Sequence, residues 1–240
     1  PTNGDWQIRS HNGGYPDLVT TFTDGLGYDV DITYESLAQA ALEHYQVDSG
    51  DIPSDSRHQQ FSGARYIVTH EDRDDGIGGT HNYQHFYDTA HIDRSGRGWI
   101  SFDHHVVIDD DQGTLLASWF RQDFPYSGVT SATRLRRHSD QQNIQESIHT
   151  WDKTTTTSTS PDLHFIRVES TTSKNWEIGG IDDGDLIRTV LDDPEYNTTY
   201  GYVEERTVTT ADPAEPYPWI THTDFDAIAD TGSNEWCLGL

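Results

Sequence analysis

The segment Arg97–Arg121, RGWISFDHHVVIDDDQGTLLASWFR, decides the fold class of this chain. In its first half the side chains alternate, and one side of that alternation carries Ile100, Phe102, His104, Val106 and Ile108. A polar turn over residues 109–113 then leads into a second β-type run, TLLASWF. Two alternating runs joined by a short polar turn are typical of an antiparallel hairpin, which we predict here.

The rest of the chain repeats this pattern of short β-type runs parted by turn residues. We predict further strands at residues 18–23, 64–70, 163–171, 175–180, 185–191 and 199–210. The segment between 71 and 98 is rich in Asp, Gly and His and is predicted to be loop-like, and Asp193-Pro194 is predicted to be a turn.

Two segments have helical signals. Residues 33–45 begin with Thr33 as a cap and place Tyr34, Leu37, Ala41 and Tyr45 on one face. Residues 139–149 begin with a capping box formed by Ser139 and Gln142.

These elements predict an all-β fold, a β-sandwich or jelly-roll-like barrel with one or two short helices and long loops. We expect a single β-rich domain over residues 1–240, with an N-terminal arm at about 1–17 and an apolar C-terminal tail at about 236–240. The low-complexity run at 154–160 is interpreted as an exposed edge or loop, with a domain linker as the alternative.

The chain carries 41 acidic residues against 15 basic ones, for a formal net charge of −26. Aspartate outnumbers glutamate by 30 to 11, and Lys153 and Lys174 are the only lysines. Such a charge opposes a compact state, whereas about 1 M salt shortens the Debye length to about 3 Å and screens the repulsion. The composition resembles that of proteins from extreme halophiles, an ordinary acidic protein being the alternative, and it disfavours nucleic acid as a partner.

Cys237 is the only cysteine, so an intrachain disulfide is impossible. No apolar run approaches the roughly 20 residues that span a bilayer, and no segment resembles a signal peptide. We therefore expect no transmembrane segment, synthesis without a cleaved leader, and a place in a virion or in the cytoplasm of an extreme halophile.

Three histidines, His81, His85 and His91, have the spacing of the elongated zincin motif, in which histidines on successive helical turns bind zinc. Asn82 stands where that motif carries its catalytic Glu, and Asp88 stands at its glycine position. Without the carboxylate, no general base would activate a metal-bound water. The cluster is therefore a candidate zinc site but not a candidate catalytic site, and no catalytic residue is predicted.

Other candidate sites have simpler explanations. Acidic residues around Gly76 and Gly184 offer oxygens to Ca²⁺, but neither group has calcium-loop spacing, so we interpret them as solvated turn carboxylates. His104 and His105 point to opposite faces of a strand and cannot jointly bind one ion. We expect His104 to be a hydrogen-bonded core histidine.

The basic cluster Arg134, Arg136 and Arg137 and the apolar tail residues Trp236, Leu238 and Leu240 are predicted to lie at contacts between copies. Repeated copies of so acidic a chain repel one another unless basic groups lie at the seams, and bidentate Arg–carboxylate pairs would supply them. Folding of the tail back onto its own domain, and phosphate binding by the arginines, are the alternatives.

Three function classes follow. We favour a structural, assembly-forming protein, a homo-oligomer or a partner of other structural proteins, because no catalytic set is present and both ends are suited to docking on neighbours. In composition and architecture the chain resembles virion shell or tail proteins of viruses that infect halophiles. The alternatives are a histidine-rich, metal-dependent enzyme and a carbohydrate-binding module that uses exposed Trp and Tyr.

Overall fold

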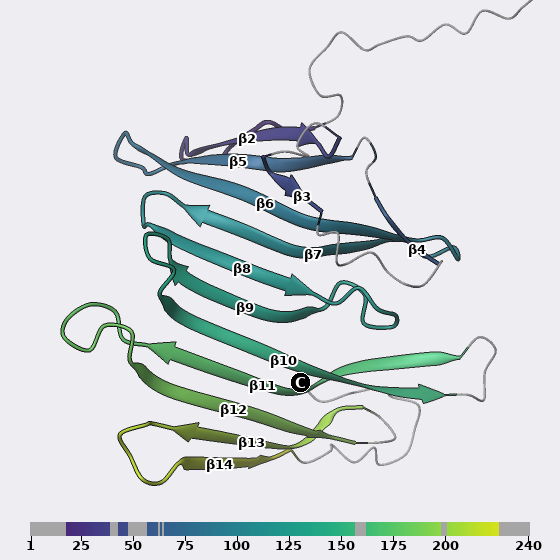
Figure 1. Cartoon of the computed structure of the whole chain (residues 1–240), viewed down its shortest axis with the longest axis vertical. Helices are drawn as coiled ribbons and strands as arrows, with labels where there is room; N and C mark the ends of the chain where they lie inside the picture. Colours follow the sequence, from purple (N-terminus) through teal and green to yellow (C-terminus); the bar gives the residue numbers. More distant parts are fainter. Residues whose placement is uncertain are drawn as a thin grey trace, which may run out of the picture.

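The computed structural model describes residues 18–38, 43–47, 57–61, 63, 65–156, 162–197 and 201–225. All fourteen strands found there belong to one sheet, and no helix is present in these ranges. The all-β prediction is confirmed. Figure 1 shows the strands from β2 to β14 side by side in one twisted layer. The two facing sheets of a sandwich or jelly roll are therefore not confirmed.

The main path of the sheet is an antiparallel meander, in which β1, β2 and β5–β14 follow one another in sequence order. Two short strands lie off this path, where β3 pairs parallel with β6 and β4 pairs antiparallel with its end. The strands are β1 (Thr21–Thr23), β2 (Asp29–Ser36), β3 (Tyr45–Gln46), β4 (His58–Gln60), β5 (Tyr66–Asp74), β6 (Thr80–Asp93), β7 (Gly98–Asp109), β8 (Thr114–Phe120), β9 (Thr130–Arg137), β10 (Asn143–Thr156), β11 (Leu163–Trp176), β12 (Leu186–Tyr196), β13 (Val203–Ala211) and β14 (Trp219–Asp224).

The predicted hairpin forms between β7 and β8, where Asp109 pairs with Thr114 and Val106 with Ala117. Its two histidines lie on opposite faces, as predicted. His104 stacks on Trp119 at 4.6 Å between ring centroids, and His105 stacks on Tyr87 at 4.5 Å.

The helix predicted over 139–149 is wrong. Residues 143–149 belong to β10, which pairs with β9 on one side and β11 on the other. The backbone at Gln141 has φ 62°, a left-handed conformation that an α-helix excludes. The Gln142 amide donates instead to Asp140 Oδ1 at 3.1 Å, so the residues of the expected capping box form a turn.

The helix predicted over 33–45 is also wrong at its start, because residues 33–36 complete β2 and pair with β5. Tyr45 belongs to β3, and residues 39–42 lie outside the described ranges. In both segments the apolar residues satisfy a helical period locally, but pairing with neighbouring strands decides the backbone conformation.

Two predicted breaks in the sheet are strands. The predicted loop over 71–98 contains the end of β5 and all of β6, with the glycines of GIGG confined to the turn between them. The predicted turn at Asp193-Pro194 lies within β12. Beyond Asp192 this strand pairs with β13 alone among the described strands, so Pro194 lies on a local edge where its missing amide proton costs little.

The hydrophobic core lies at the N-terminal end of the sheet, where β3 and β4 pack beside β6. Its buried members are Leu37, Tyr45, Ile67 and Ala90, and partly buried Phe61, Tyr87, Trp99 and Phe102 pack against them. Along β10–β14, by contrast, the described residues form a single layer of strands with apolar side chains exposed. No helix in the described ranges is long and apolar enough to cross a membrane.

Candidate functional site: an uncovered apolar row

The three histidines of the candidate zinc site lie along one extended strand, β6, and do not converge. At about 3.3 Å per residue, His81 and His85 are separated by about 13 Å of strand, instead of one helical turn. Each has its own neighbour: Asp111 lies 3.4 Å from His81, and Gln122 lies 2.5 Å from His91. In the ranges that the structure covers, no group of three or more His, Cys, Asp or Glu side chains is placed to hold a metal ion.

His85 instead belongs to a ring stack on one face of the sheet. Its Nδ1 lies 3.2 Å from His105 Nε2, and the two rings are nearly parallel. Desolvation by burial lowers the pKa of His105 to about 4 and also lowers the pKa of His85, against the opposing effect of Glu71. The stack is thus built from neutral rings.

His104, predicted to be a hydrogen-bonded core histidine, contacts Trp119 through the face of its ring. It is half-buried, stacks on Trp119, and has no hydrogen-bond partner for Nε2 among the described residues. Burial lowers its pKa.

The acidic clusters around Gly76 and Gly184 are turn carboxylates. Asp75 Oδ1 accepts from the amides of Ile77 and Gly79 at 2.8 and 2.7 Å. Asp183 accepts from the Gly179 amide at 2.7 Å. These carboxylates stabilise turns through hydrogen bonds that lower the pKa of both groups.

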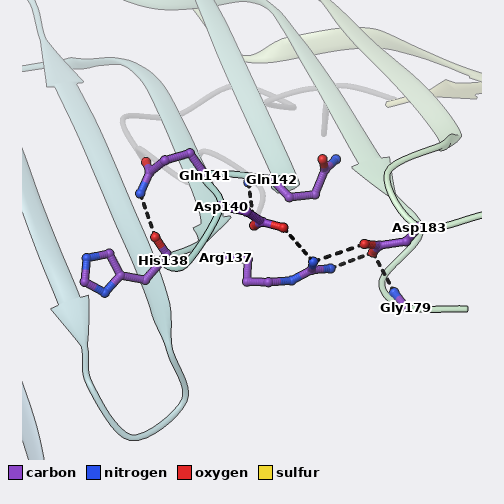
Figure 2. A network of polar contacts seen from close by, with 7 residues as sticks. All are labelled: Arg137, His138, Asp140, Gln141, Gln142, Gly179 and Asp183. Carbon is purple, nitrogen blue, oxygen red and sulfur yellow. Dashed lines mark hydrogen bonds and ion pairs between the residues drawn. The ribbon is translucent and has the colours of Figure 1, made fainter.

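Two of the arginines predicted at contacts between copies form ion pairs within the chain. Figure 2 shows Arg137 between Asp140 and Asp183, with 2.9 Å to the first carboxylate and 2.5 Å to the second. Arg134 donates through Nε to Glu146 at 2.7 Å. Arg136 contacts the amide oxygen of Asn143 and has no carboxylate partner among the described residues, so it is the member most available to a neighbouring copy.

The tail residues of the same prediction, Trp236, Leu238 and Leu240, lie outside the described ranges. Their contact with a neighbouring copy therefore stays a prediction.

A surface feature that sequence analysis missed lies on the C-terminal half of the sheet. Cross-strand register places Ile148, Thr172, Leu191, Thr209 and Ile220 in one line on one face. We call these five residues the apolar row. Ile148, Leu191 and Ile220 are 43%, 37% and 56% exposed.

The same register line continues through Ala132 and Trp119 to His104. There the side chains cover one another, since Trp119 lies between the His104 ring and the Arg134 guanidinium. This register line is thus covered over β7–β9 and open over β10–β14, where the apolar row lies. The sequence signals this row only through the alternation of side chains within each short strand. The line across the sheet depends on four strand pairings, which the sequence alone does not give.

The open face ends at a strand edge. Among the described strands, β14 pairs only with β13 and forms one end of the sheet, and all six of its residues are exposed. One backbone edge of β14 therefore lacks a strand partner in the described structure, and such an edge is a template for pairing with another chain.

In comparisons with known proteins, no protein-family model matches the chain, and no curated protein matches it.

Proposed function

We propose that this chain is a structural protein that assembles with copies of itself through the apolar row and the neighbouring β14 edge. The observation that carries the proposal is the exposure of Ile148, Leu191 and Ile220 in one line on a single-layer sheet. These three side chains alternate with Thr172 and Thr209 along the line, and exposed apolar side chains gathered on one face mark interaction sites in soluble proteins.

The size of the open face suits a second copy. Five strands spaced by about 4.8 Å, with an average length of about 35 Å, make a flat footprint of roughly 800 Å². A stable protein–protein contact buries about 800 Å² on each partner, and the corrugated surface of a sheet exceeds its flat footprint. Two copies packed face to face would create between chains the two-layer arrangement of a β-sandwich, about 10 Å apart.

The finer form of the proposal is a shell or tail component of a virion from an extreme halophile. The acidic, lysine-poor composition supports a high-salt setting, because molar salt would let copies with a net charge of −26 approach one another. The open face and open edge support a repeating array. The separated histidines of β6 give no comparable support to a metal-dependent enzyme.

The test is sedimentation velocity in about 2 M NaCl, at which charge repulsion is screened. We expect the wild type to assemble and Ile220→Ser to lower the assembled fraction severalfold. Ile181→Ser is the matched control, since Ile181 is 99% exposed in a turn outside the apolar row. A wild type that stays monomeric at high concentration would contradict the proposal.

Two further variants test the predicted contact residues. Deletion of residues 236–240 and the substitution Arg136→Ser should each lower the assembled fraction while the circular dichroism spectrum of the monomer is unchanged. Arg136 is a cleaner choice than Arg137, because Arg137 also joins two turns of its own chain. Normal assembly of both variants would show that these residues do not lie at the contact between copies.

A further inference from the structure

The face opposite the apolar row carries a groove of about 530 Å³ at the same end of the sheet. It lies over β11–β14 and the β13–β14 loop, and its lining includes Asn175, Arg188, Asp212, Glu215, Tyr217 and Trp219. Trp219 and Ile220 are neighbours on β14 and therefore project to opposite faces. The groove volume is within the range of about 300–1,000 Å³ that is usual for ligand sites.

Two aromatic rings at the border of the groove are exposed to solvent. Tyr217 and Trp219 are each 81% exposed, and neither ring stacks on another ring or a cation within the described residues. The other described tryptophans are at least half-buried, since Trp219 is the only one among the exposed large hydrophobic residues. The groove therefore presents aromatic surface that the fold itself does not use.

The loop that carries Tyr217 is conformationally restricted. Pro213, Pro216 and Pro218 restrict its backbone, and an Asx turn forms where the Ala214 amide donates to Asp212 Oδ1 at 2.8 Å. A loop with few accessible conformations loses little entropy when it binds a ligand.

Three of the polar side chains that line the groove have no partner within the described residues. Within the described residues, seven other arginines pair with carboxylates of the same chain. Arg188, Asn175 and Glu215, by contrast, have no side-chain hydrogen bond or ion pair with any described residue. A guanidinium, an amide and a carboxylate are planar groups that form paired hydrogen bonds with a ligand.

We propose that this groove binds a neutral oligosaccharide. Pyranose rings have an apolar C–H face that stacks on Tyr217 and Trp219, and vicinal hydroxyls that both donate to carboxylates and accept from Arg188. Anionic ligands are disfavoured, because Asp212 and Glu215 outnumber the single guanidinium and the whole chain carries −26. The groove opens on the face opposite the apolar row, although Trp219 belongs to β14, whose backbone edge is part of the proposed contact between copies.

The experiment uses the full chain in about 0.1 M and about 2 M NaCl. An array of neutral hexose and N-acetylhexosamine oligosaccharides, with sialylated and uronic acid glycans as the acidic arm, identifies a binder. Calorimetry then measures its affinity. We expect binding on the neutral arm only, and at least about tenfold weaker affinity for Trp219→Ala and for Arg188→Ala.

Ile220→Ala is the matched control, since it changes the next residue of β14 on the opposite face. It should leave glycan affinity within about twofold while it weakens assembly. Trp219→Ala should weaken glycan binding and leave assembly unchanged. Failure of assembly would leave this proposal intact, so the two proposals fail separately.

Three results would overturn the proposal. The first is no binding to any neutral glycan on the array. The second is binding that Trp219→Ala and Arg188→Ala leave unchanged. The third is a Trp219→Ala variant that loses self-association and keeps glycan affinity, which would make the groove a contact between copies.

Discussion

His85 and His105 show how burial of single residues makes this fold sensitive to acid. Their rings stack with Tyr87 on one face of the sheet, where desolvation disfavours the charged imidazolium. The same desolvation raises the pKa of Tyr87. Three stacked rings thus stay neutral in the folded chain.

The pH dependence of stability follows from His105, whose pKa is lowered from 6.5 to about 4. The unfolded chain binds more protons in that window, so the free energy of unfolding falls as the pH drops from about 6.5 towards 4. The loss at His105 is on the order of 2 kcal/mol after allowance for its partial exposure. Denaturant unfolding at a series of pH values measures it.

His105→Phe should flatten this dependence, because the phenyl ring keeps the stack and carries no titrating group. His138→Phe makes the same change at an exposed turn histidine and should leave the dependence as it is. Equal pH slopes for wild type and His105→Phe would contradict the assignment.

Asp183 joins two turns through a charge-assisted contact. Its carboxylate accepts from both terminal nitrogens of Arg137 and from the Gly179 amide (Figure 2). These hydrogen bonds, with that from Arg137 the largest cause, lower its pKa to about 2.

Asp183→Asn removes the negative charge and weakens these contacts. We expect hydrogen exchange at the Gly179 amide to become about tenfold faster, because local opening of the turn becomes easier. Asp182→Asn is the control, since no side-chain contact of Asp182 is found in the described structure. Equal exchange rates in the two variants would show that the pair with Arg137 does not order the turn.

At the scale of elements, the two halves of the sheet differ in how they are covered. β3 and β4 pack beside β6 at the N-terminal end, where Tyr45 is 1% exposed. The Tyr45 hydroxyl donates to the Phe61 carbonyl and accepts from the Ala90 amide, each at 3.1 Å. This side chain therefore ties the short strands to the main sheet through polar as well as apolar contacts.

Tyr45→Phe removes the hydroxyl and leaves the ring in place. We expect a loss of about 1–2 kcal/mol in the free energy of unfolding, because a buried amide loses its acceptor. Tyr217→Phe is the matched control: its hydroxyl has no partner in the described residues, and the change should cost under about 0.5 kcal/mol. Equal unfolding midpoints for the two variants would contradict this role of Tyr45.

At the scale of the whole molecule, a single-layer sheet with a small core has to tolerate a charge of −26. Mutual repulsion among the carboxylates opposes the folded state, and salt weakens that repulsion as the Debye length shortens. Ion pairs such as Arg167–Asp152 and Arg206–Asp192 offset the repulsion only locally.

We therefore expect the melting temperature to rise steadily from about 0.1 M to above 1 M NaCl or KCl, as followed by circular dichroism. The comparison of NaCl with KCl serves as a control, since screening alone predicts similar curves. An unchanged melting temperature over this range would refute adaptation of the fold to high salt.

The sequence by itself determined the β class, the β7–β8 hairpin and the opposite faces of His104 and His105. These properties follow from a side-chain period of two within one or two neighbouring strands. Composition likewise determined the acidic surface. Such features need no knowledge of which distant segments meet.

The tertiary structure alone decided the rest. Pairing with β9 and β11 overrode the helical signal at 139–149, and an extended β6 separated three histidines that a helix would have brought together. The apolar row and the Tyr217–Trp219 groove join residues from four or five consecutive strands, so their existence depends on the register of several pairings. Register is a long-range property, because a shift by one residue moves every side chain of a strand to the other face.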